Sequence, residues 1–320
     1  MSLQVFNQFA NLARTEVIAQ AVEKFNAASR GALVLSPGSA VGDFNQSAYY
    51  ANIANLIRRR NKYGTGSVSA TSISQLLEAS VKVAAGTPPI EYEPTDWNWM
   101  MKNPEEAGAV IGQQLGVGQT QDMLNAAITA LVAAFENVGA TVVHDGTAGT
   151  ITLAKLNSGA TLFGDRSQAI AAWVMHSTQY HALVAAGLTN TERLFTFENV
   201  SIMQDAMGRP FIVTDSPSLV ETDGVGAGID KYSVLGLVPN GAVVEMNDDF
   251  SASVIDVHGS ENLKRSYQAE WSFNLGLKGY TWDMTNGGKS PNDSALGTGT
   301  NWDKTASSVK DTAGVAVQVR

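Results

Sequence analysis

Residues 162–217 read LFGDRSQAIAAWVMHSTQYHALVAAGLTNTERLFTFENVSIMQDAMGRPFIVTDSP, and this stretch decides the fold. A short apolar strand, Trp173–His176, runs directly into a helix. Ser177 or Thr178 is placed to cap that helix, and Gly187 to end it. The elements that follow are a strand at Val200–Met203, a turn at Asp205–Pro210 and a strand at Phe211–Thr214.

The clearest helix signal lies before this stretch. Pro104 at the first helical position, followed by Glu105 and Glu106, predicts a helix start, and Gly139 predicts its end. We expect glycines inside it to bend or split it, because glycine is a poor helix former. These glycines are Gly112, Gly116 and Gly118, and the apolar residues spaced as one packed face are Leu124, Ile128, Leu131 and Phe135.

The N-terminal third is less regular. Residues 4–28 have the spacing of an amphipathic helix, and residues 29–48 are predicted to be an extended arm along another surface. Further on we expect a short helix at Tyr49–Ile57, Gly-, Ser- and Thr-rich chain at Gly64–Ser74, and a strand at Ala79–Ala84.

The C-terminal third is predicted to be mainly β. Apolar side chains alternate with polar ones from Tyr267 to Leu277, which is typical of a half-buried strand. In this pattern Ser272 and Asn274 belong to the polar face. We expect a loop from Thr285 to Thr305 and a last short strand at Ala313–Val319.

Composition narrows the class of protein. The chain has 320 residues, 44% hydrophobic and only 16% charged, so it can bury a large core and carries little charge. A net charge of -9 is the wrong sign for a surface that grips nucleic acid. No cysteine is present, which excludes disulfides and thiol nucleophiles. We expect no signal peptide and no apolar run near the ~20 residues that span a bilayer.

Motifs for catalysis or cofactors fail in detail. His176 and His181 are five residues apart, which does not place two imidazoles on one helical face for a metal. Gly287–Ser290 ends like a phosphate-binding loop, but Asp283 stands where its first glycine belongs. Gly224–Gly228 lies in a polar loop and is a poor dinucleotide fingerprint. With no nucleophile elbow either, the sequence predicts no enzyme, no cofactor and no metal.

One basic run stands out. Arg58, Arg59, Arg60 and Lys62 lie together, with Tyr63 beside them. Three interpretations remain open: contacts with nucleic-acid phosphates, a solvated helix end, and ion pairs with a neighbouring subunit.

The ordered set of these features resembles one family. The order strand–helix–strand–turn–strand resembles the axial domain of tailed-bacteriophage major capsid proteins, which have the Hong Kong 97-type fold. The resemblance is also carried by Gly208–Pro210 with the strand and Asp215 after it, by Leu235–Pro239, by the long strand through Trp271, and by Asn286–Pro291.

The resemblance implies an α+β protomer in five segments. They are an N-terminal arm (1–48), an extended loop (49–87), a peripheral domain with a long spine helix (88–140), an axial domain (141–238), and returning strands with a C-terminal segment (239–320). Candidate inter-subunit contacts are the basic run and the two ends, Asp223 and Asp230, of a glycine-rich loop expected to meet its symmetry copies.

Function and partners are implied by the same resemblance. We expect pentamers and hexamers in an icosahedral head around double-stranded DNA, assembled in the host cytoplasm without a membrane. Expected partners are a separate scaffolding protein, a portal and a cement protein. An encapsulin-like compartment, which would enclose protein cargo, and a soluble hydrolase or binding protein are the alternatives.

Overall fold

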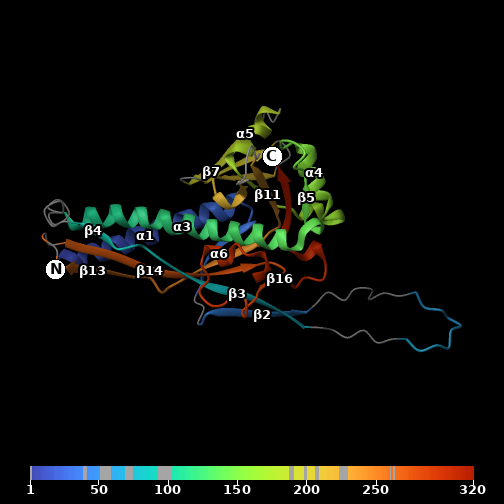
Figure 1. Ribbon diagram of the computed structural model, residues 1–320, viewed down its shortest axis with the longest axis horizontal. Coiled ribbons are helices and arrows are strands. Elements are labelled where there is room, and N and C mark those ends of the chain that lie inside the picture. Colours follow the sequence, from blue (N-terminus) through green and yellow to red (C-terminus); the bar gives the residue numbers. More distant parts are fainter. Residues whose placement is uncertain are drawn as a thin grey trace.

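The computed structural model describes residues 2–38, 42–50, 59–68, 75–92, 103–186, 191–197, 200–205, 209–222, 230–259, 261 and 264–320. The first body is a sheet that runs alongside a long central helix, α3 (Pro104–Val138), and the second body of sheet and helix lies by the C-terminal half of α3 (Figure 1). The predicted α+β class is confirmed. The other helices are α1 (Ser2–Ala28), α4 (Leu153–Thr161), α5 (Ser177–Ala185) and α6 (Asp293–Leu296).

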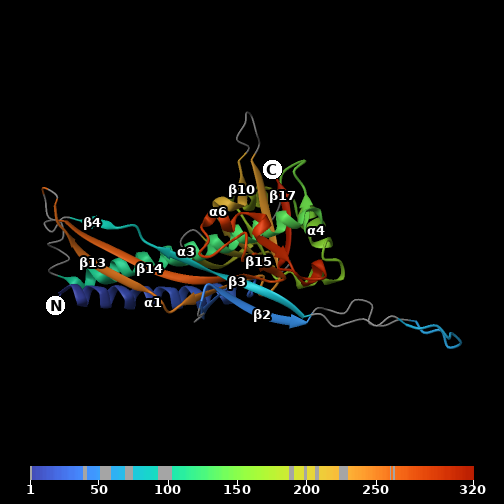
Figure 2. The ribbon, with the colours of Figure 1, turned by 60° about the horizontal axis from the view of Figure 1, so that its bottom comes forward.

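The first sheet has seven strands and forms the elongated part of the molecule (Figure 2). Its order is β1-β12-β14-β3-β2, and β13 and β4 also pair with the long strand β14. The strands are β1 (Leu33–Gly38), β2 (Phe44–Tyr50), β3 (Gln75–Gly86), β4 (Ile90–Tyr92), β12 (Ala242–Asn247), β13 (Ser251–Val257) and β14 (Lys264–Leu277).

The second sheet has eight strands, and residues 162–217 supply four of them, β6 to β9. Its order is β5-β17-β11-β6-β9-β8-β7, with β10 paired to β11. The strands are β5 (Val143–Asp145), β6 (Ala172–Met175), β7 (Thr191–Phe197), β8 (Val200–Asp205), β9 (Pro210–Thr214), β10 (Val220–Glu221), β11 (Lys231–Leu237) and β17 (Gly314–Val319). A small third sheet pairs β15 (Tyr280–Trp282) with β16 (Trp302–Lys304).

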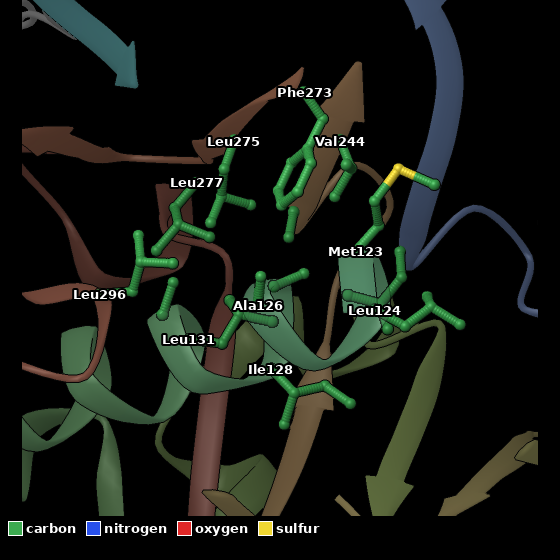
Figure 3. Packing of buried hydrophobic residues seen from close by; sticks show 14 of the residues in the cluster. Met123, Leu124, Ala126, Ile128, Leu131, Val244, Phe273, Leu275, Leu277 and Leu296 are labelled. Carbon is green, nitrogen blue, oxygen red and sulfur yellow. The ribbon is translucent and has the colours of Figure 1, made fainter. Parts of the chain in front are cut away.

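The core of the first body lies between α3 and the first sheet. The predicted apolar face of α3 is confirmed, because Leu124, Ile128, Leu131 and Phe135 are all buried. Figure 3 shows side chains of α3 packing toward Phe273 and neighbouring residues of β14. A second cluster, which includes Phe163 and Trp173, fills the space between the second sheet and helices α4 and α5.

Helix α3 begins at Pro104 and is capped at its C-terminal end by Gly139, as predicted. The predicted bend or split is wrong, because the helix is continuous through its glycines. The glycines instead let α1 approach closely. A Cβ on Gly112 would lie 2.1 Å from the backbone oxygen of Ala10, and a Cβ on Gly108 would lie 2.6 Å from that of Phe6.

Helix α3 also has the length and composition of a membrane span. With the turn that follows it, Pro104–Thr141, it reaches a hydropathy of 1.4 in its most apolar window, contrary to the sequence prediction. That window is 61% buried. Because α1 and the first sheet cover it, we interpret α3 as the core helix of a folded subunit.

The N-terminal segment differs from the predicted arm. The helix predicted for residues 4–28 is confirmed as α1, which packs along α3. Residues 33–38 form β1, which pairs in parallel with β12 of this chain's own sheet. Tyr49 and Tyr50 end strand β2 where a short helix was predicted, and the rest of that predicted helix lies outside the described residues.

Several local predictions for the second body are confirmed, including β6, β8 and β9. The predicted cap of α5 is wrong, because His176 is the N-cap and its Nδ1 accepts the backbone N–H of Thr178 at 3.2 Å. Helix α5 ends at Ala185, and Gly187 lies outside the described residues.

Two C-terminal predictions need correction. The expected loop Thr285–Thr305 contains α6 and β16, and its Trp302 is fully buried against Trp282. In β14, Ser272 and Asn274 are buried although the alternation placed them on the polar face. Their environment is polar, because the end of β12 and the chain after it contact them: Asp249 accepts the N–H of Ser272, and Asn247 accepts the side-chain N–H of Asn274.

The domain limits stay a prediction, with one difference in detail. The predicted last strand is confirmed as β17. It lies in the second sheet between β5 and β11, and the resemblance implied returning strands and a C-terminal segment for residues 239–320.

A lysine holds the loop before α4. The Nζ of Lys155 donates hydrogen bonds to the carbonyls of Gly146, Gly149 and Thr150, at 2.7, 2.6 and 2.8 Å. Three charge-assisted bonds satisfy all the protons of one ammonium group. This lysine therefore fixes a loop that has few apolar anchors of its own.

We expect Lys155→Met to lower the free energy of unfolding by about 1–3 kcal/mol, because the methionine keeps most of the apolar stem but leaves three carbonyls without their donor. Urea unfolding of the isolated subunit measures the change. Lys24→Met, at an exposed position of α1, is the control and should change stability by less than about 0.5 kcal/mol. Equal effects of the two changes would contradict this role of Lys155.

Candidate inter-subunit surfaces

The first candidate surface is the segment that carries the basic run. Residues 59–68, which we call the projecting segment, lie beyond the ends of β2 and β3 and far from both sheets (Figures 1 and 2). All ten residues are exposed, and Tyr63 is 86% exposed. The side-chain oxygen of Asn61 accepts the N–H of Tyr63, which makes a local turn. The segment therefore exposes Tyr63 and three cationic side chains, which a neighbouring molecule can contact.

The basic residues of the projecting segment have no partners within the described part of the chain beyond a local ring contact. Lys62 lies 5.9 Å from the ring centre of Tyr63. None of the ion pairs between described residues includes Arg59, Arg60 or Lys62. Arg58 lies outside the described residues. Cations of this kind are available for a contact with another molecule.

The strands at the base of this segment are also uncovered. Residues 45–48 of β2 are exposed on both faces, and Leu77 of β3, which pairs with Ala48, is 56% exposed. Met284 is 42% exposed beside them, with its sulfur accepting a hydrogen bond from Gln46 at 3.3 Å. A two-stranded ribbon with both faces in water has little to stabilise it alone.

The second candidate surface is the axial tip, by which we mean the end of β10 and the start of β11. Glu221 and Lys231 are cross-strand partners and form an ion pair at 2.8 Å. Asp230 is half-buried next to this pair, and Asp223 lies outside the described residues. The tip rises from the second sheet on the side away from the first (Figure 2).

A polar hollow of about 440 Å³ lies at the base of the axial tip. Burial raises the pKa of the nearby Glu136, whose carboxylate accepts a hydrogen bond from Gln318 at 3.1 Å. The hollow is lined by Asp145, Thr147, Glu221, Thr222, Lys231, Gln318 and Arg320. Charges of both signs on an exposed surface favour a contact with another polar surface over a small apolar ligand.

The structure does not bring the predicted site residues together. Arg59, Arg60 and Lys62 belong to the projecting segment, and Asp230 lies at the axial tip. No group of three or more metal-ligating side chains occurs in the part of the chain that the structure describes. The arrangement is one of separated, exposed surfaces.

A family model described as major capsid protein 13-like (Gp13-like) matches residues 2–316. The chain belongs to this family. Membership in the major capsid protein 13-like family confirms the resemblance seen in the sequence. It identifies the protein as a structural capsid protein, found in the capsid of a virion.

Solved structures agree with the family assignment. The capsid asymmetric unit of cyanophage Pam1 is 11% identical, with a TM-score of 0.52 over 88% of this chain and 85% of that chain. A protein of Microbacterium phage Oxtober96 is 11% identical, with a TM-score of 0.50 over 92% of this chain and 91% of that chain. At these identities the similarity shows the fold alone, and that fold is the Hong Kong 97-type fold.

The encapsulin alternative has weaker support. The holo-SrpI encapsulin complex from Synechococcus elongatus is 14% identical, with a TM-score of 0.46 over 76% of this chain and 80% of that chain. That score carries no argument, whereas the family match spans almost the whole chain. No curated protein sequence matches the chain. The major capsid protein 13-like family therefore decides for the phage capsid.

Proposed function

We propose that this capsid protein assembles into pentamers and hexamers of an icosahedral head that encloses double-stranded DNA. In each ring the axial tip points toward the symmetry axis and the projecting segment reaches over the next subunit. Contacts of this kind are head-to-tail, and a head-to-tail contact closes a ring when its rotation closes. The protein acts as a building block and not as an enzyme.

The observation that carries this proposal is the complete exposure of residues 59–68. Ten consecutive residues that include a tyrosine and three cations have no cover from the described parts of their own chain. Aromatic and arginine side chains are favoured in the centres of protein interfaces. In the proposed shell, residues 59–68 contact the neighbouring subunit, which covers side chains that are exposed in the single subunit.

Charge supports the enclosure of DNA without binding to its sequence. A net charge of -9 means that the wall as a whole does not attract the phosphate backbone. We propose a separate scaffolding protein, a portal and a cement protein as further partners, and assembly in the host cytoplasm.

The experiment is expression of the chain, with and without its phage's scaffolding protein, followed by electron microscopy. We expect closed shells built from rings of five and six. We also expect Arg59→Gln with Arg60→Gln to reduce the yield of shells at least about tenfold, because two inter-subunit cations are lost at every contact. Circular dichroism should show that this variant is folded.

The control is Lys24→Gln with Arg30→Gln, which removes the same charge from exposed positions in or just after α1. It should assemble like the wild type. If the wild type stays monomeric under all these conditions, the proposed function is wrong. If the two double variants assemble equally well, the role of the projecting segment is wrong.

A further inference from the structure

His176 connects two elements of the second body. It follows strand β6 and is the N-cap of helix α5, where its ring Nδ1 accepts the backbone N–H of Thr178 at 3.2 Å. The hydroxyl of Thr178 lies 3.1 Å from the same nitrogen. A ring nitrogen that accepts a hydrogen bond carries no proton, so the neutral ring holds its proton on Nε2. The cap of α5 therefore requires the neutral form of His176.

The other ring nitrogen of His176 faces an acidic side chain. Nε2 lies 3.6 Å from a carboxylate oxygen of Asp215, the residue that follows β9. Strands β6 and β9 are parallel neighbours, so both residues lie at the carboxyl end of the same pair of strands. The side chain of His176 is 18% exposed and that of Asp215 is 60% exposed. Water therefore reaches the pair, and the ring can exchange protons with the solvent.

The elements packed around His176 carry further titratable side chains. Besides Asp215, these are Tyr232 and Lys231 of β11, Glu221 of β10, and Tyr180 and His181 of α5. The ring centres of Tyr232 and His176 are 5.5 Å apart. Lys231 is already paired with Glu221 at 2.8 Å. Among the ion pairs of the described residues, His176 takes part only in the one with Asp215.

Protonation of His176 turns the acceptor of the cap into a donor. Histidine is the side chain whose charge ordinarily changes between about pH 5 and pH 8. Once Nδ1 carries a proton, it cannot accept the N–H of Thr178, and the positive ring also meets the positive end of the α5 dipole. The same positive ring is attracted by the carboxylate of Asp215. Acid therefore removes the cap and strengthens the contact with the segment after β9.

We propose that His176 is a pH-dependent cap: the neutral ring caps α5, and the protonated ring releases α5 and pairs with Asp215. This pair joins the ends of β6 and β9, so the ring can leave the helix without leaving the sheet. The cap stabilises part of the second core, because Tyr180 and Leu183 of α5 are buried there. Acid is therefore expected to loosen α5 while β6 and β9 stay paired. This inference does not depend on how the subunits assemble.

Two substitutions of His176 reproduce the two states without a titrating ring. Asparagine is among the best N-cap residues, so His176→Asn should keep α5 capped at every pH, whereas His176→Ala should leave α5 uncapped. Loss of an N-cap corresponds to about a fivefold increase in the equilibrium constant for local unfolding of the helix. At about pH 8 the wild-type α5 should unfold as rarely as in His176→Asn, and at about pH 5 as often as in His176→Ala.

Hydrogen exchange of the isolated subunit, followed by mass spectrometry of peptides that cover α5, measures this local unfolding. Protection factors remove the direct effect of pH on the exchange chemistry. His181→Asn is the matched control, because it removes an exposed histidine from the same helix and should keep the wild-type pH dependence. Asp215→Asn should move the transition to lower pH, since the protonated ring loses its carboxylate. Peptides that cover β6 should keep their protection throughout.

Nitrogen NMR of histidine-labelled wild-type protein tests the cap without any substitution. Above the transition Nδ1 of His176 should be the unprotonated nitrogen, and below it both nitrogens should carry protons while the amide of Thr178 loses its protection. A neutral ring with its proton on Nδ1 would overturn the proposal. Equal protection of the wild-type α5 at both pH values would also overturn it, as would a pH dependence that persists in His176→Asn or disappears in His181→Asn.

Discussion

Gly112→Ala is expected to destabilise the subunit by about 3 kcal/mol or more, at the upper end of what overpacking costs. The added Cβ would lie 2.1 Å from the backbone oxygen of Ala10 and 2.8 Å from its carbonyl carbon. Backbone atoms cannot rotate away, so α1 as a whole would have to separate from α3. Urea unfolding of the isolated subunit measures the loss.

Gly118→Ala is the matched control on the same helix. A Cβ there meets nothing within 4 Å, so the usual preference of a helix for alanine should stabilise the subunit by about 0.5–1 kcal/mol. Opposite signs for the two changes are the expected result. If both changes stabilise the subunit, the close contact between α1 and α3 does not exist in solution.

Leu131→Ala is expected to cost about 2–5 kcal/mol, because the side chain is fully buried between α3 and the first sheet (Figure 3). Such a loss is a large part of the stability of a typical domain. Thermal unfolding of the isolated subunit is the measurement. Val110→Ala, on the same helix but 43% exposed, should change stability by less than about 0.5 kcal/mol. A wild-type melting temperature for Leu131→Ala would count against the assigned core.

The sequence predicted the elements whose causes are local. Pro104 and Gly139 mark the ends of α3 through backbone chemistry, and the alternation from Tyr267 to Leu277 marks the inner face of β14. Asn240 has a positive φ of 59° in the turn that follows β11, and the run Pro239–Gly241 is likewise a local turn signal. Local signals in the sequence therefore predict where a helix or strand lies, but they do not predict which other element it packs against.

Errors arose where distant segments meet. The glycines of α3 were interpreted through helix propensity, although their spacing of four residues at Gly108, Gly112 and Gly116 is a signal for a second helix lying close. Trp302 was placed in a loop because its partner, Trp282, lies in a separate segment. A groove between α3 and the first sheet was not predicted for the same reason, since it is lined by four segments far apart in the chain: the end of β3, α3, β14 and the start of α6.

The position of β17 has a consequence for the order of events during synthesis. This strand pairs with β11 on one side and, through Ala316 and Val143, with β5 on the other. The second sheet thus depends on contacts of very long sequence separation, which form late in folding. While β17 is still inside the ribosome, the sheet has a gap between its edge strand β5 and β11. We expect a nascent chain to remain unable to close a ring until β17 has left the ribosome, so the shell receives only subunits whose second sheet is complete.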